Sequence, residues 1–105
     1  MTTHTQPGQQ TWIDELRSTL TSDFEMHTAR LTELTADTGD PAEAHTRAAL
    51  LAATRQSLEQ ITGALRRIAE GRYGICERCT GPIPQERLEV LPHARFCVPC
   101  QQKQR

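Results

Sequence analysis

The chain has 105 residues and a formal net charge of −1, and 36% of its residues are hydrophobic and 4% aromatic. This length suits one compact domain or a small domain with an extension, and the composition excludes a large apolar core. A chain of this kind needs a metal, disulfides or long helical packing to stay folded. Because the sequence offers neither a pocket-sized core nor a nucleophile–base pair, we expect no enzymatic activity.

Residues 1–10 are polar, contain Pro7 and Gly8, and show no hydrophobic periodicity, which predicts a disordered tail. This segment has neither the basic start nor the apolar stretch of a signal peptide. No segment of the chain approaches the roughly 18 apolar residues needed to cross a bilayer. We therefore expect a cytoplasmic protein, in which paired cysteines stay reduced and favour metal over disulfides.

Two segments repeat bulky residues at the spacing of a coiled-coil seam. The first seam lies in a helix predicted over residues 11–36 and consists of Ile13, Leu16, Leu20, Phe24, His27, Leu31 and Leu34. The second helix runs to about residue 70, and its seam consists of Ala44, Ala48, Leu51, Leu58, Ile61, Leu65 and Ile68. Two helices of similar length with a tight link must fold back on each other. We therefore predict that residues 11–70 form an antiparallel coiled-coil hairpin.

The link between the helices, residues 37–42, forms the tip of this hairpin. Asp40, Pro41 and Glu43 occupy the N-cap, N1 and N3 positions of a capping box that begins the second helix. Turn chemistry therefore explains Asp40 and Pro41 fully, and Asp37 in part.

The last part of the chain, residues 71–105, contains two pairs of cysteines separated by 17 residues: Cys76, Cys79, Cys97 and Cys100. This spacing is typical of a four-cysteine zinc site. Two intervening residues let both sulfurs of a pair face one ion, and two pairs complete a tetrahedron with no place for a catalytic water. The sequence thus predicts one structural zinc ion. The alternatives are two disulfides or redox-active dithiols, and a redox motif would normally need an α/β fold that this chain is too small and helical to form.

The segment between the cysteine pairs mixes apolar residues with glycines and prolines, which predicts short strands and turns wrapped around the metal. Residues 71–105 hold three acidic and six basic side chains. A tetrathiolate zinc site would add about −2 to this charge. No basic stripe then remains to grip phosphates, so we expect no sequence-specific DNA binding.

The residues around the cysteines resemble the DksA/TraR C4-type zinc finger. The matching positions are Gly71-Arg72-Tyr73-Gly74-Ile75-Cys76, then Cys79, Ile83, Arg87-Leu88 and Pro92, and finally Cys97-Val98-Pro99-Cys100-Gln101. In DksA-like members a long antiparallel coiled coil precedes the finger, as the two seams suggest independently. The resemblance implies a mainly α fold with a zinc finger, and a transcription regulator that binds bacterial RNA polymerase and inserts the coiled-coil tip through the secondary channel toward the active site.

The resemblance also implies a role for the tip. Asp37, Asp40 and Ala42 reproduce the D-x-x-D-x-A pattern of the DksA tip, at the hairpin turn. Together with Glu33 and Glu43, the two aspartates form an acidic turn that contains no basic residue. These carboxylates repel one another, and a cationic or metal-bearing partner site would relieve the repulsion. The alternative is a solvated acidic turn with no partner.

Two further hypotheses follow. The resemblance raises ppGpp as a candidate ligand, but Gln60 and Gln101 stand where DksA has basic residues that help to bind it, which argues against an alarmone response. In the second hypothesis the protein is a structural adaptor whose zinc finger and coiled coil bind another protein. In that case substitutions of Asp37 and Asp40 would change little, while the coiled-coil face would matter.

Overall fold

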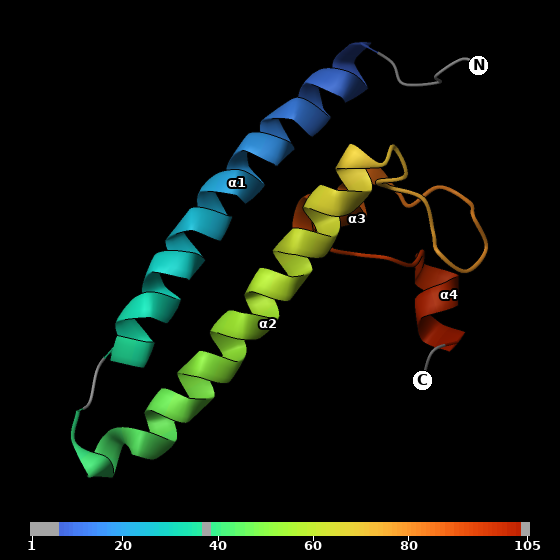
Figure 1. The fold of residues 1–105 in the computed structure, drawn as a ribbon. Coiled ribbons are helices and arrows are strands. Elements are labelled where there is room, and N and C mark those ends of the chain that lie inside the picture. Colours follow the sequence, from blue (N-terminus) through green and yellow to red (C-terminus); the bar gives the residue numbers. More distant parts are fainter. Residues whose placement is uncertain (1–6, 37–38, 104–105) are drawn as a thin grey trace. The chain divides into compact units, whose positions relative to one another are not determined.

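The computed structural model describes residues 7–36 and 39–103, and this part of the chain is mainly helical (Figure 1). Its elements are α1 (Pro7–Ala36), the 3-10 turn η1 (Pro41–Glu43), α2 (Ala44–Ala69), α3 (Gln85–Val90) and α4 (Val98–Lys103). Within the described ranges, β-type pairing is limited to one isolated antiparallel bridge between Ile75 and Pro82. No helix in these ranges combines the length and the apolar character needed to span a membrane.

The chain divides into two compact units, residues 1–62 and residues 63–105, so the boundary lies inside α2. In the first unit α1 and α2 run antiparallel and in contact (Figure 1). Leu20 of α1 and Thr54 and Ile61 of α2 are buried there, with at most 9% of each residue exposed. The predicted mainly α fold and antiparallel hairpin are confirmed.

The hairpin seam is only partly covered. Ile13, Leu16 and Leu31 are half-buried, while Phe24 remains 39% exposed although it occupies a seam position. Two helices can cover only one stripe of each other, so the edges of the seam stay open to solvent. His27, also on the seam, is half-buried, and its Nδ1 lies 2.8 Å from the carbonyl oxygen of Asp23 one turn earlier.

The first helix begins earlier than predicted. Helix α1 starts at Pro7, so the disordered tail expected for residues 1–10 is wrong for residues 7–10. Proline suits the first turn of a helix, because its backbone φ is already set and its missing N–H would have no partner there. Residues 1–6 of the expected tail lie outside the described residues.

Asp40 begins the second helical segment, as predicted. Its backbone is extended, and its carboxylate Oδ1 accepts a hydrogen bond from the backbone N–H of Ala42 at 2.9 Å. Pro41 occupies the first turn, and the N–H of Glu43 donates to the carbonyl oxygen of Asp40 at 2.9 Å. The first turn is therefore a 3-10 turn that leads into α2.

Helix α2 ends at a glycine, also as predicted. Gly71 has a φ of 75°, and its N–H donates to the carbonyl oxygen of Ile68 at 3.2 Å. The N–H of Arg72 donates to the carbonyl oxygen of Arg67 at 3.0 Å. These two bonds form a Schellman motif, which requires a left-handed residue at the position of Gly71. The motif follows the last residue of the helix, Ala69, which lies seven residues before the first cysteine.

Between the cysteine pairs the structure corrects the expectation of short strands. Helix α3 follows Pro84, and its residues Gln85–Glu89 include strong helix formers. Leu88 of this helix is 4% exposed and belongs to the core of the second unit. The prolines that flank this short run of helix formers favour turns and so conceal the helix in the sequence. Proline interrupts a helix interior but is tolerated immediately before a helix.

The Asp40 cap leads to a stability prediction. We expect Asp40→Ala to lower the free energy of unfolding by about 1 kcal/mol, because the N–H of Ala42 loses its acceptor. Asp40→Asn keeps an oxygen acceptor at the same place and should leave stability nearly unchanged. Urea unfolding followed by circular dichroism measures both variants. Equal losses for the two substitutions would contradict the cap.

Candidate metal centre

The four cysteines meet at one point in the second unit. The Sγ atoms of Cys76, Cys79, Cys97 and Cys100 all lie within 4.8 Å of one another. The Sγ atoms of Cys79 and Cys97 are 3.8 Å apart. A tetrahedral zinc site with zinc–sulfur bonds of about 2.3 Å has sulfur–sulfur edges of about 3.8 Å. A disulfide would need about 2.0 Å, and all four cysteines are unbridged. The cluster is therefore consistent with one structural zinc ion.

A tight turn positions the first pair of sulfurs. The N–H of Cys79 points to the Sγ of Cys76 at 3.5 Å, and the N–H of Gly81 points to the Sγ of Cys79 at 3.4 Å. The N–H of Cys76 in turn donates to the carbonyl oxygen of Gly81 at 2.8 Å, which closes the turn. A Cβ at Gly81 would lie 3.3 Å from the Sγ of Cys79, so the residue after the turn must be small. Backbone N–H groups aimed at sulfur stabilise its negative charge.

The second pair lies at the beginning of α4. The N–H of Gln101 donates to the carbonyl oxygen of Cys97 at 2.8 Å, so Cys97 and Cys100 are separated by one helical turn and share a face. Cys76 and Cys100 are buried, Cys97 is half-buried and Cys79 is exposed. The cluster thus has a closed side and a side that faces solvent.

As thiols, these cysteines interact strongly. Burial acts to raise the pKa of Cys76, but hydrogen bonds from the backbone of Cys79, Cys97 and Arg78 outweigh it and lower that pKa to about 6. A hydrogen bond with Cys97, together with burial, raises the pKa of Cys100 to about 12. The cluster therefore accepts one negative charge readily and resists further ionisation. A divalent cation removes this penalty.

Glu77, which lies between the cysteines of the first pair, forms ion pairs with three arginines. Arg95 donates to its Oε1 from both Nε, at 3.0 Å, and Nη2, at 2.9 Å. The Oε2 atom lies 3.8 Å from Nη1 of Arg72 and 3.9 Å from Nη1 of Arg67. The hydrogen bonds from Arg95 lower the pKa of Glu77. Reasoning from sequence missed this network, because Glu77 and Arg95 are separated by 18 residues and no local pattern connects them.

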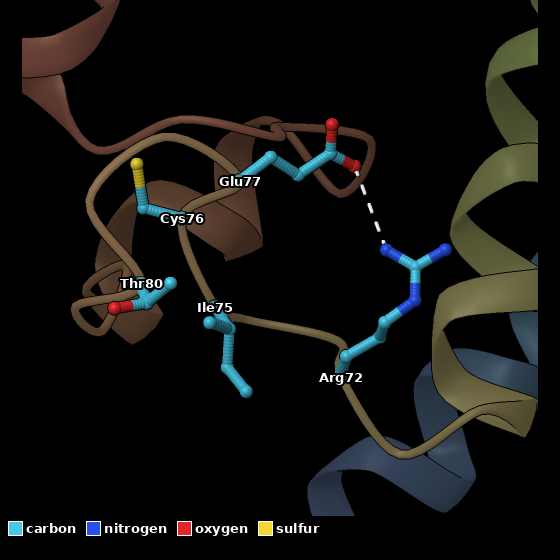
Figure 2. Close-up of a pocket in the computed structure, with 5 residues that line it drawn as sticks. All are labelled: Arg72, Ile75, Cys76, Glu77 and Thr80. Atoms are coloured by element: carbon cyan, nitrogen blue, oxygen red, sulfur yellow. Dashed lines mark ion pairs between the residues drawn. The ribbon is translucent and has the colours of Figure 1, made fainter.

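An open pocket of about 340 Å³ lies beside the first cysteine pair. It is lined by Arg72, Ile75, Cys76, Glu77 and Thr80. Figure 2 shows the guanidinium of Arg72 and the carboxylate of Glu77 facing each other, while the sulfur of Cys76 points away from that carboxylate. The ionic network and the sulfur cluster thus occupy different sides of the same turn.

Tyr73 connects the beginning of the finger to the segment that precedes the second cysteine pair. Its hydroxyl donates a hydrogen bond to the carbonyl oxygen of Pro92 at 2.8 Å, across 19 residues of chain. Burial raises the pKa of Tyr73 to about 12, so the hydroxyl stays protonated and remains a donor at neutral pH.

The other residues singled out from the sequence lie elsewhere. Asp40 and Ala42 are exposed at the turn before α2, and Asp37 lies outside the described residues. Gln60 is half-buried on α2, and Gln101 is exposed on α4. The roles of the tip residues stay predictions.

Comparison with known proteins gives one family match and several relatives. Residues 71–105 match the family described as prokaryotic dksA/traR C4-type zinc finger, a range that contains all four cysteines. The protein named RNA polymerase-binding transcription factor DksA of Caulobacter vibrioides is 38% identical over 81 residues, covering 73% of this chain and 57% of that protein. General stress protein 16O of Bacillus subtilis is 45% identical over 47 residues, covering 45% of this chain and 29% of that protein.

A solved structure extends the similarity beyond the finger. Transcription factor DksA2 from Pseudomonas aeruginosa matches with a TM-score of 0.64 and 28% identity, covering 96% of this chain and 86% of that one. The chain spans 57% or less of the two curated relatives, whereas the structural match includes both the hairpin and the finger.

The pKa values of the cysteines predict how zinc binds. Zinc requires thiolates, and Cys100 with a pKa raised to about 12 is protonated at neutral pH, so binding must release at least its proton. We expect zinc affinity to rise with pH between 6 and 8, as proton release becomes easier. Isothermal titration calorimetry in buffers of different ionisation enthalpy measures the number of protons released. A heat that does not depend on the buffer would contradict this expectation.

Thr80 leads to a second prediction at this site. It is a β-branched residue with a φ of 60°, a left-handed conformation that such residues rarely adopt. We expect Thr80→Asn, which tolerates this conformation, to raise the free energy of unfolding of the zinc-loaded protein by about 1 kcal/mol. Thr80→Val keeps the branched shape and should bring no gain. Thermal unfolding of the two variants provides the measurement, and a gain for Val equal to that for Asn would argue against strain.

Proposed function

Because this chain belongs to the DksA/TraR C4-type zinc finger family, we propose that it is a transcription regulator that binds bacterial RNA polymerase. The observation that carries the proposal is the match to DksA2, which runs over 96% of this chain at 28% identity and so includes the hairpin as well as the finger. The Caulobacter relative, 38% identical over 81 residues, is named as RNA polymerase-binding. This proposal assigns no covalent chemistry to the protein.

In the proposed mechanism the hairpin enters the secondary channel and brings the residue 37–42 turn toward the active site. Asp40 supports this role, because its carboxylate is exposed and its direction is set by the hydrogen bond to the N–H of Ala42. A carboxylate already held in place loses less entropy when it meets a cationic or metal-bearing partner site. Asp37 would add a second charge to the same turn. The zinc ion holds the finger together and takes no part in the chemistry of the polymerase.

One observation favours the adaptor as a second candidate. Phe24, Met26 and Leu50 of the hairpin unit are 39%, 60% and 37% exposed. Exposed apolar side chains on a helical hairpin can bind a helix of another protein. The adaptor would use these side chains and would be indifferent to the charges of the tip.

The first test is binding of the zinc-loaded protein to purified bacterial RNA polymerase core, with and without a second factor that occupies the secondary channel. We expect micromolar or tighter binding that the second factor competes away. Binding that ignores the competitor would move the contact to another surface of the polymerase. No binding at micromolar concentration would overturn the proposal and leave the adaptor.

The tip is tested separately in a promoter transcription assay. We expect Asp37→Asn/Asp40→Asn to bind polymerase nearly as well as the unchanged protein and to lose most of its effect on transcription. Asparagine preserves the cap at Asp40, so a loss would report the charge rather than the stability of the turn. Met26→Ser is the matched control for the adaptor, and a transcription effect that depends on Met26 but not on the aspartates would favour that candidate. Because Gln60 and Gln101 carry no charge, we expect added ppGpp to leave the effect unchanged.

A further inference from the structure

The last two turns of α2 belong to the finger rather than to the hairpin. The boundary between the two compact units falls between Thr62 and Gly63, in the interior of this helix. A glycine in a helix interior costs about 1 kcal/mol relative to alanine. A Cβ at Gly63 would lie 3.3 Å from Nη1 of Arg67, one turn later. The glycine therefore leaves room for the Arg67 guanidinium to lie close against the helix.

Arg67 is buried although it carries a charge. The residue is 6% exposed, and burial lowers its pKa. Its Nη2 donates to the carbonyl oxygen of His93 at 3.2 Å, and its Nη1 lies 3.9 Å from Oε2 of Glu77. Among the described residues, no group accepts a hydrogen bond from its Nε. A buried guanidinium with few partners depends strongly on the ones it has.

Both partners of Arg67 are positioned by the cysteine cluster. Glu77 lies inside the first cysteine pair, directly after Cys76, and His93 lies four residues before Cys97. A bound ion would hold the two pairs together and so keep the carboxylate of Glu77 and the carbonyl oxygen of His93 within reach of the guanidinium. The N–H of Glu77 also donates to the carbonyl oxygen of Arg95 at 2.9 Å, which joins these two segments directly.

We propose that Arg67 is a positioning residue that couples the metal centre to the end of α2, so that metal binding orders the helix beyond Gly63. When the ion is removed, the two cysteine pairs separate and Arg67 loses the groups that replace water around its charge. The guanidinium then turns to solvent, and the Schellman motif closed by the carbonyl of Arg67 opens with it. Linkage makes the effect reciprocal, because a group that stabilises the metal-bound form raises metal affinity.

The direct test is hydrogen–deuterium exchange of the full chain, zinc-loaded and after removal of zinc by a chelator. We expect residues 63–69 of α2 to lose protection together with residues 70–100, while residues 44–62 keep theirs. Equal protection of residues 63–69 in the two states would overturn the proposal. Loss of protection along the whole of α2 would also overturn it, because the effect would not begin at Gly63.

A matched pair of arginines tests the residue itself. Arg66 is exposed beside the buried Arg67, so Arg66→Met controls for the loss of one charge in the same turn. We expect Arg67→Met to weaken zinc affinity by about tenfold, the size of effect typical of residues that support metal ligands, while Arg66→Met changes it little. Competition with a chromogenic chelator measures these affinities, and equal effects of the two variants would contradict the proposal.

If Arg67→Met fails to fold, the variants Arg67→Lys and Glu77→Gln still test the proposal. Lysine retains the charge but reaches fewer partners, so it should restore part of the affinity. A double-mutant cycle between positions 67 and 77 should show less than the sum of the two single losses. Fully additive losses would mean that Arg67 does not act through Glu77.

Discussion

The second unit depends on the convergence of four sulfur atoms that repel one another when ionised. Its buried apolar residues are few: Ala64, Ile68, Ile83 and Leu88 lie at 8% exposure or less together with two of the cysteines. Such a core is too small to hold the turns of the finger by hydrophobic burial alone. A cation between the sulfurs converts their repulsion into attraction and closes both cysteine turns at once. A metal bound at this cluster would thus be the main source of order in residues 71–100.

Charge is the second constraint, and it extends from the metal centre outward. Glu77 is the one acidic residue placed between the first two cysteines, and its carboxylate faces Arg67, Arg72 and Arg95. Arg95 makes the best-aligned pair, while the longer distances to the other two indicate weaker attraction. The exposed pairs contribute little to stability by themselves, because water screens them. Arg67 differs because it is buried, and its pairing therefore connects the finger to the end of α2.

The hairpin is stabilised by the packing of its two helices and by local hydrogen bonds at its turn. Its two helices cover one stripe of each other, so few residues are fully buried and several apolar side chains remain exposed. The turn before α2 is held by local hydrogen bonding at Asp40 rather than by a core. A hairpin whose turn is held by local hydrogen bonds is suited to entering a channel in a larger partner, which is the function proposed for it. The same carboxylate therefore serves the fold and the proposed activity.

Features that depend on local spacing could be predicted from the amino-acid sequence. Patterns within a few residues predicted the four-cysteine cluster, the two long helices, the Asp40 cap and the helix end at Gly71, because chain geometry leaves little choice over so short a range. Local signals are ambiguous at two places: the prolines around residues 80–92 flank a short helix, α3, and Pro7 begins a helix although proline is also common in irregular segments. The contacts of Arg67 and the pairing of Glu77 with Arg95 depend on the tertiary structure and leave no local pattern in the sequence. Arg67 lies 10 residues from Glu77 and 26 from His93, and Glu77 lies 18 residues from Arg95, so the fold of the finger has to bring these groups together.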